Sequence, residues 1–121
     1  IKVGNIEPKR DYVYVDDIAM GLFKLGTTEF PESCAWPVCA NLSTGHEHSV
    51  REVLEALQVV TGRSLTLEQD PSRMRASDRP HLCGDNSHLR ALVGWAPDRS
   101  FMDGLKDLVA WAQANPDQMV G

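Results

Sequence analysis

The 121-residue sequence lacks long apolar segments, has few cysteines and is short of positive charge. No run approaches the roughly 20 apolar residues that a membrane-spanning helix needs, and the start of the sequence lacks the basic-then-apolar pattern of a signal peptide. We therefore expect a cytoplasmic protein with no membrane contact. Lys and Arg total 12 against 17 Asp and Glu, and the resulting formal charge of -5 argues against a nucleic-acid-binding surface.

The scarcity of cysteine also restricts the possible cross-links and metal sites. The cysteines are Cys34, Cys39 and Cys83. They are odd in number and form no Cys-x-x-Cys pair, so a disulfide framework or a four-thiolate zinc site is not expected, and we predict buried, reduced thiols. The other metal candidates are His46, Glu47, His48 and His81, together with Cys83. Their spacing matches no familiar ligand pattern, so solvated loop histidines are favoured and no metal ligand is assigned.

The remaining composition is that of an ordinary globular protein. Hydrophobic residues make up 42% and charged residues 24% of the sequence, and its length suits a single domain over residues 1–121. Short apolar runs alternate with helical patterns, which predicts an α/β fold with short strands and about four helices. The expected strands are 1–6, 10–15, 38–42 and 64–68, of which the first two could form a hairpin. The expected helices are 16–25, 49–61, 85–92 and 100–114.

Capping residues mark where these helices begin and end. Asp16 follows a β-prone run and is expected to cap the first helix, a reading favoured over an acid/base pair with Asp17. Ser49 and Glu52 have the spacing of a capping box, and Ser100 begins a similar pattern before the last helix. The predicted helix ends are at Gly26, Gly62, Gly94 and Asn115.

Two arginine-bearing segments are the strongest candidates for binding chemistry. The loop 70–82 carries Arg75-x-x-Asp78 between prolines, and guanidinium groups bind phosphate oxygens through paired hydrogen bonds of about 1.5–3 kcal/mol each. A solvated basic loop is about equally compatible with this spacing. Arg10 lies at the head of an expected strand, where a rigid element would hold it toward a phosphate or carboxylate.

The aromatic and turn residues allow more than one interpretation. Trp36, Trp95 and Trp111 could stack on a base, but Trp95 and Trp111 are more typical of a core. The stretch Asn41–Gly45 could approach a ligand with its backbone, and a plain turn is equally consistent with it. No Ser/His/Asp or Cys/His spacing singles out a catalytic residue.

Five motifs occur in a fixed order along the chain. They are Gly4-Asn5-Ile6-Glu7-Pro8-Lys9-Arg10-Asp11-Tyr12-Val13-Tyr14-Val15-Asp16-Asp17, Asn41-Leu42-Ser43-Thr44-Gly45 with Ser49-Val50-Arg51-Glu52-Val53, Asp70-Pro71 with Arg75-Ala76-Ser77-Asp78-Arg79-Pro80, Gly84-Asp85-Asn86-Ser87, and Gly94-Trp95-Ala96-Pro97. Together they resemble the C-terminal part of the NAD(P)-dependent nucleotide-sugar epimerase/dehydratase family, which are extended short-chain dehydrogenase/reductases. Within it, the chain looks most like GDP-mannose 4,6-dehydratases and 4-keto-6-deoxy-mannose reductases.

The resemblance implies roles for particular residues. Arg10 and Arg75 match family positions that grip the nucleotide diphosphate, and Asp78 matches an acid that bonds the ribose or orients the neighbouring arginine. Asn41–Gly45 would support the substrate lobe. His88 stands where the family often has Lys, so this chain departs from the pattern there.

Two family motifs are missing from this sequence, namely the Gly-x-x-Gly-x-x-Gly turn that holds the dinucleotide and the catalytic Tyr-x-x-x-Lys. The resemblance therefore implies a small mixed α/β substrate-binding lobe, a C-terminal fragment whose Rossmann cofactor lobe is largely absent. Such a lobe would bind a nucleotide diphosphate sugar weakly and would not be catalytically competent alone. NAD or NADP would serve the intact enzyme and would not be bound by this chain alone. The alternative is a non-catalytic interaction or regulatory domain that self-associates through exposed apolar surface.

Overall fold

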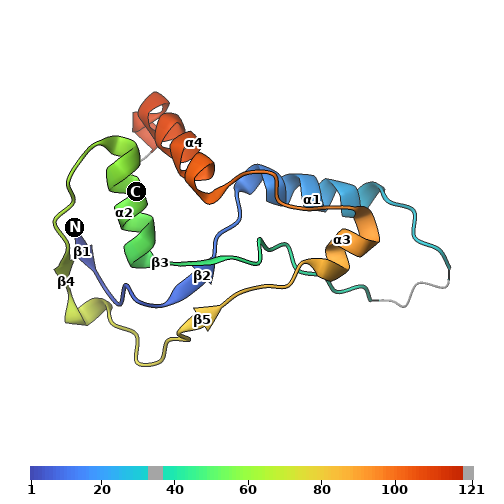
Figure 1. Ribbon diagram of the computed structural model, residues 1–121, viewed down its shortest axis with the longest axis horizontal. Helices are drawn as coiled ribbons and strands as arrows, with labels where there is room; N and C mark the ends of the chain where they lie inside the picture. The colour runs from blue at the N-terminus through green and yellow to red at the C-terminus, as the bar shows by residue number, and fades with distance from the viewer. Residues whose placement is uncertain (33–36, 119–121) are drawn as a thin grey trace.

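The computed structural model describes residues 1–32 and 37–118, and its elements spread along one long axis (Figure 1). The strands are β1 (Lys2–Val3), β2 (Lys9–Asp11), β3 (Glu47–Ser49), β4 (Glu68–Gln69) and β5 (His81–Leu82). The helices are α1 (Val15–Thr27), α2 (Val50–Thr61), α3 (Ser87–Val93) and α4 (Phe101–Ala114), with two 3₁₀ turns, η1 (Pro71–Arg73) and η2 (Pro116–Gln118). The predicted mixed α/β fold with short strands and four helices is confirmed for these residues.

Strand β2 is the centre of the structure and connects its two ends. It pairs antiparallel with β3 and parallel with β5, so that Arg10 lies opposite both His48 and Leu82. Strand β1 instead pairs parallel with β4. In Figure 1, α2, β1 and β4 lie at one end of the molecule and α1 and α3 at the other, with the three-stranded sheet between them.

The expected hairpin between 1–6 and 10–15 is wrong. The backbone of β1 is occupied by the chain around β4, where Asp70 donates its N–H to Val3 O at 2.8 Å. The strand predicted over 10–15 is only three residues long, because β3 and β5 provide partners only as far as Asp11. Strand pairing therefore depends on segments that are distant in the sequence.

Two other predicted strands are also corrected. The stretch 38–42 contains no strand, and side-chain contacts connect it to the chain around α3: Asn41 Nδ2 donates to Asp85 O at 3.1 Å, and His88 Nδ1 lies 2.9 Å from Cys39 O. Of the predicted strand 64–68, only Glu68 belongs to β4.

Helix α1 departs from the prediction at both ends. It follows Tyr14, whose side chain makes no capping bond, so Asp16 is not the cap. Asp17 is the buried acid, and its carboxylate accepts the backbone N–H groups of Asp98 and Arg99. The helix also continues past Gly26 and ends where the Thr28 N–H bonds Lys24 O at 3.0 Å.

The other helix ends follow local sequence rules. Ser49 Oγ accepts the Glu52 N–H while the Glu52 carboxylate accepts the Ser49 N–H, so the predicted capping box is confirmed. Gly62 and Gly94 end α2 and α3 in the left-handed conformation that glycine adopts without strain, with φ of 65° and 63°. Ser100 Oγ accepts the Asp103 N–H and caps α4.

Trp95 follows α3, is 1% exposed and is the largest fully buried side chain among the described residues. Its Nε1 donates to Asp17 O at 2.8 Å, and a Cβ added to Gly21 would lie 3.0 Å from that same nitrogen. Trp95 is therefore a core residue, as predicted. Trp111 is not, because it is 47% exposed on α4, and Trp36 lies outside the described residues.

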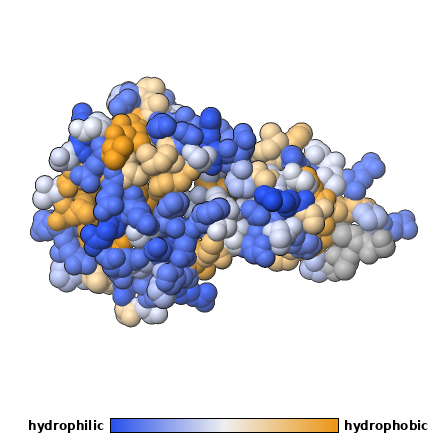
Figure 2. Space-filling model, in the orientation of Figure 1, coloured by the Kyte–Doolittle hydropathy of each residue, from blue (hydrophilic) through white to orange (hydrophobic). Residues whose placement is uncertain are grey.

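Some apolar residues and thiols are more exposed than expected. Leu108 on α4 is 51% exposed, and Figure 2 shows apolar surface around this end of the molecule. The prediction of buried thiols is wrong for Cys39 and Cys83, because Cys39 lies in an irregular surface segment and Cys83 follows edge strand β5. Cys34 is outside the described residues. None of the described helices is long and apolar enough to cross a bilayer.

Candidate functional site

A groove of about 350 Å³ lies where the connection from β1 to β2 faces the segment after η1. Its lining includes the three residues that the sequence singled out, Arg10, Arg75 and Asp78, and also Arg73. These side chains come from segments more than 60 residues apart in the sequence. The fold therefore brings Arg10 and Arg75 to the same cavity.

Arg10 is held rigidly at one side of this groove. Its Nη1 donates to Lys9 O at 2.7 Å and to Arg79 O at 2.8 Å, and its Nη2 donates to Asp78 Oδ1 at 2.5 Å. A guanidinium carries five N–H donors, so two remain for a ligand after these three bonds. Asp78 thus fixes the orientation of Arg10 and balances its charge.

The other two arginines of the groove are less constrained. Arg75 is exposed, and its guanidinium makes no hydrogen bond or ion pair to another described residue. Arg73 Nε lies 3.7 Å from Asp70 Oδ2, which makes an ion pair but is too long for a hydrogen bond. Hydrogen bonds from Ser72 lower the pKa of Asp70 below its ordinary value, so this carboxylate is charged at neutral pH.

The two walls of the groove approach closely at Gly4. A Cβ added there would lie 2.4 Å from Arg73 O, which no real Cβ contact permits. Only glycine therefore allows the chain after β1 to lie against η1. This contact positions the backbone from which Arg73 and Arg75 extend.

Asp11, the residue after Arg10 on β2, acts as a carboxylate clamp on the face of the strand opposite to Arg10. It accepts Thr44 N at 2.9 Å, Thr44 Oγ1 at 2.6 Å, Gly45 N at 2.9 Å and Gly84 N at 3.3 Å. Partial burial alone would raise the pKa of Asp11, but these hydrogen bonds outweigh it and hold the pKa below its ordinary value. Asp11 thus ties the 44–45 turn and the chain after β5 to the strand that carries Arg10.

The sequence did not single out Asp11 or Asp17 as functional or structural centres, and it named Arg73 only as one of the arginines of the 70–82 loop. For Asp11 the sequence did contain a signal. Adjacent residues of a strand point to opposite faces, so Arg10 and Asp11 were expected to contact different parts of the structure. The turn at Asn41–Gly45 is bonded by Asp11 through Thr44 and Gly45 and does not line the groove. Its role as a support for the substrate lobe stays a prediction.

The histidines expected in solvated loops lie partly in strands. The His48 ring stacks on Phe101, with centroids 3.8 Å apart and an angle of 13° between the planes. His81 Nδ1 lies 2.6 Å from Glu47 Oε1, which joins β5 to β3. No group of three or more His, Cys, Asp or Glu side chains within the described part of the chain is arranged to hold a metal ion.

Comparison with known proteins decides the family. The profile of the family described as GDP-mannose 4,6 dehydratase matches residues 1–108. The chain belongs to this family of nucleotide-sugar epimerases and dehydratases. The resemblance noted in the sequence is thereby confirmed.

Relatives of the family differ in the reaction that their names describe. The chain is 26% identical over 110 residues to GDP-6-deoxy-D-mannose reductase of Pseudomonas aeruginosa, covering 91% of this chain and 34% of that protein. It is 29% identical over 108 residues to UDP-glucose 4-epimerase of Neisseria meningitidis, covering 89% and 31%. The chain therefore spans about a third of the length of these relatives.

A solved family structure has the same fold. UDP-glucose 4-epimerase from Bifidobacterium longum, in complex with NAD+ and UDP, superposes with a TM-score of 0.83 at 25% identity. The match covers 97% of this chain and 36% of that one. The small α/β arrangement described above is thus part of a larger family structure.

Proposed function

We propose that this chain supplies the nucleotide-sugar-binding side of an NAD(P)-dependent epimerase, dehydratase or reductase, and that its groove binds the diphosphate. The observation that carries the proposal is the shared cavity of Arg10 and Arg75, with Asp78 bonded to Arg10. The related epimerase structure that holds UDP supports the same class of ligand. The cytoplasmic location expected from the composition is part of this proposal.

The chemistry of the groove suits a pyrophosphate. A diphosphate spreads its negative charge over several oxygens, and two guanidinium forks can fix both its position and its orientation. Arg10 is pre-oriented by Asp78 and two backbone carbonyls, so little side-chain entropy remains to be lost on binding. Asp78 acts here as a positioning residue for Arg10.

The residues of this chain do not fit a dinucleotide cofactor. The sequence has no Gly-x-x-Gly-x-x-Gly turn to present helix N–H groups to the dinucleotide phosphates, and no Tyr-x-x-x-Lys. We therefore propose that NAD or NADP is bound by other parts of the full enzyme, where it would exchange hydride with the sugar. This chain would contribute substrate choice and would not be active alone.

A second candidate is a non-catalytic interaction domain, which the exposed apolar residues of α1 favour. Val15, Leu22 and Phe23 are 68%, 57% and 64% exposed. This is an unusual concentration of exposed apolar side chains for one surface helix of a globular protein. Size-exclusion chromatography with and without nucleotide separates the two candidates. A nucleotide-indifferent dimer supports the interaction domain, whereas a monomer stabilised by nucleotide supports the half-site.

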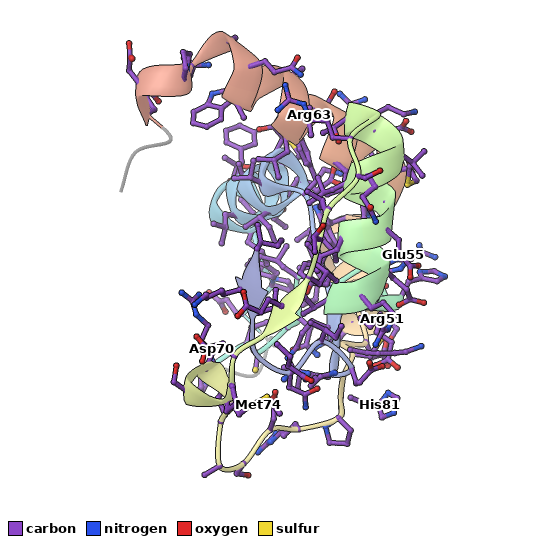
Figure 3. The ribbon with its side chains drawn as sticks, turned by 90° about the vertical axis from the view of Figure 1, so that its left-hand side faces the viewer. Arg51, Glu55, Arg63, Asp70, Met74 and His81 are labelled. Carbon is purple, nitrogen blue, oxygen red and sulfur yellow. The ribbon has the colours of Figure 1, made fainter. Side chains whose placement is uncertain are left out.

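Arg75→Ala is expected to weaken binding of UDP-glucose or GDP-mannose about fivefold, because one solvent-facing guanidinium contact is lost. The measurement is an NMR titration of the 121-residue chain at low salt, where we expect weak, millimolar binding. Arg63→Ala is the matched control, because it removes the same charge from the loop after α2, which lies at the opposite edge of the view in Figure 3 from Asp70 and Met74. Equal affinities of the two variants would contradict the assignment of Arg75, and submicromolar binding would contradict the half-site.

A further inference from the structure

The segment 38–42 has the features of a strand that lacks a neighbour. Its even-numbered residues are partly covered, whereas Cys39 and Asn41 are exposed, which is the alternation of a strand. The segment carries no charged residue, although charge is a common protection of strand edges that stay open to solvent. It is therefore better explained as a strand of an incomplete sheet than as a surface loop.

One edge of this segment is occupied and the other is free. In an extended chain, the N–H and C=O groups of every second residue point to the same edge. The carbonyls of Cys39 and Ser43 are both bonded by side chains of α3 or of its N-terminal cap, at 2.9 and 2.7 Å. The backbone groups of the even-numbered residues point to the opposite edge, where they bond no other residue that the structure describes.

Helix α1 covers this segment with one face and leaves an apolar face uncovered. A Cβ added to Gly21 would clash with the Leu42 side chain, so helix and segment lie close together. Val15, Leu22 and Phe23 share another face of α1 and are exposed. A helix is about 10–12 Å wide and neighbouring strands lie about 4.7–4.9 Å apart, so α1 is wide enough to cover 38–42 and one further strand.

We propose that the free edge of 38–42 and the uncovered face of α1 together bind a β-strand of the same enzyme that this chain does not include. This inference rests on the proposed function, in which the chain is one side of a larger enzyme, and names the surface that joins the two parts. The chain spans 34% and 31% of the two relatives described above, so most of a family protein remains to provide this strand. The added strand bonds the even-numbered backbone groups and buries the apolar face of α1.

Amide hydrogen exchange of the 121-residue chain, followed by NMR, tests whether the edge is free. We expect the N–H groups of Ala40 and Leu42 to exchange about tenfold or more faster than that of Lys9, which bonds Pro80 O at 2.8 Å. Equally slow exchange in a monomer would overturn the inference, because the edge would already be covered. Protection that grows with protein concentration would also overturn it, because a second copy of this chain would then be the occupant.

The partner is tested by a graft in which this chain replaces the matching segment of the Pseudomonas aeruginosa reductase. We expect the amides of Ala40 and Leu42 to be protected about tenfold or more in the graft relative to the isolated chain. Leu22→Lys should lower the Tm of the graft by about 5 °C or more, because it buries a charge, and should change that of the isolated chain by about 1 °C or less. Val59→Lys is the matched control, because Val59 is 75% exposed on α2, and it should leave both proteins unchanged.

The outcomes separate this inference from the proposed diphosphate site. Equal effects of Leu22→Lys and Val59→Lys in the graft would overturn the inference, and so would a graft that stays unfolded although both parent proteins fold. Neither result bears on sugar-nucleotide binding, because the groove lies at the other end of the molecule and is measured on the isolated chain (Figure 1). A protected edge in the graft together with no ligand binding would overturn the diphosphate site and support the inference.

Discussion

Replacing Trp95 with alanine is expected to lower the free energy of unfolding by about 3–5 kcal/mol, the usual cost of removing a fully buried aromatic side chain. Trp95 is 1% exposed, and its indole N–H bonds the backbone of α1 at Asp17. The substitution would leave a cavity between α1 and α3 and would remove the donor to that carbonyl. A loss of this size is a large part of the 5–15 kcal/mol that stabilises a typical domain.

Urea unfolding followed by circular dichroism measures this effect without relying on tryptophan fluorescence. Trp111→Ala is the matched control, because the same side chain is removed from a position that is 47% exposed. We expect the control to cost about 1 kcal/mol or less. If both substitutions cost the same, Trp95 is not the packing centre that joins these two helices.

Asp11→Asn is expected to be the second most damaging change, at about 2–4 kcal/mol. Asparagine keeps one carbonyl oxygen but replaces the other with an NH₂ group. Whichever way the amide turns, donors then face backbone N–H groups of Thr44, Gly45 or Gly84 that the carboxylate had bonded. Asp98→Asn is the control, since it removes the same charge from an exposed side chain. Equal unfolding free energies for the two variants would contradict the clamp.

The same clamp gives the stability a defined pH dependence. The pKa of Asp11 is lowered in the folded chain, so its contribution is fully present above the unfolded pKa of about 3.9 and is lost as the pH falls through the lower folded value. The unfolding free energy of the unsubstituted chain should therefore fall more steeply as the pH drops below about 4 than that of Asp11→Asn. Parallel curves would show that Asp11 is not the carboxylate responsible.

Local sequence rules predicted the parts of the fold that local contacts determine. The capping box at Ser49 and the glycine ends at Gly62 and Gly94 were predictable, because each is complete within a few residues. Strand pairing was not, because β2 finds its partners 36 or more residues away along the chain. Whether an extended segment such as 12–14 is a strand depends on partners that no local pattern reveals.

The candidate site, like the fold, was predictable from the sequence only in part. The resemblance to the family selected Arg10, Arg75 and Asp78, and the fold brings them to one groove. It gave no reason to select Arg73, which also lines the groove and forms an ion pair with Asp70 at 3.7 Å. The role of Asp17 was also beyond the sequence, because its partners Asp98 and Arg99 are about 80 residues distant and their N–H groups carry no side-chain signal.

The most direct test of the diphosphate site is a residue-by-residue map of where a sugar nucleotide binds. Backbone amide shifts of the 121-residue chain would be followed by NMR during titration with UDP-glucose and with GDP-mannose. The account predicts saturable shifts at 3–6, at Arg10 and at 73–78, with α3 and the C-terminal half of α1 unaffected. Shifts confined to that distant end, or none at millimolar ligand, would contradict the claim that Arg10 and Arg75 form a nucleotide diphosphate site.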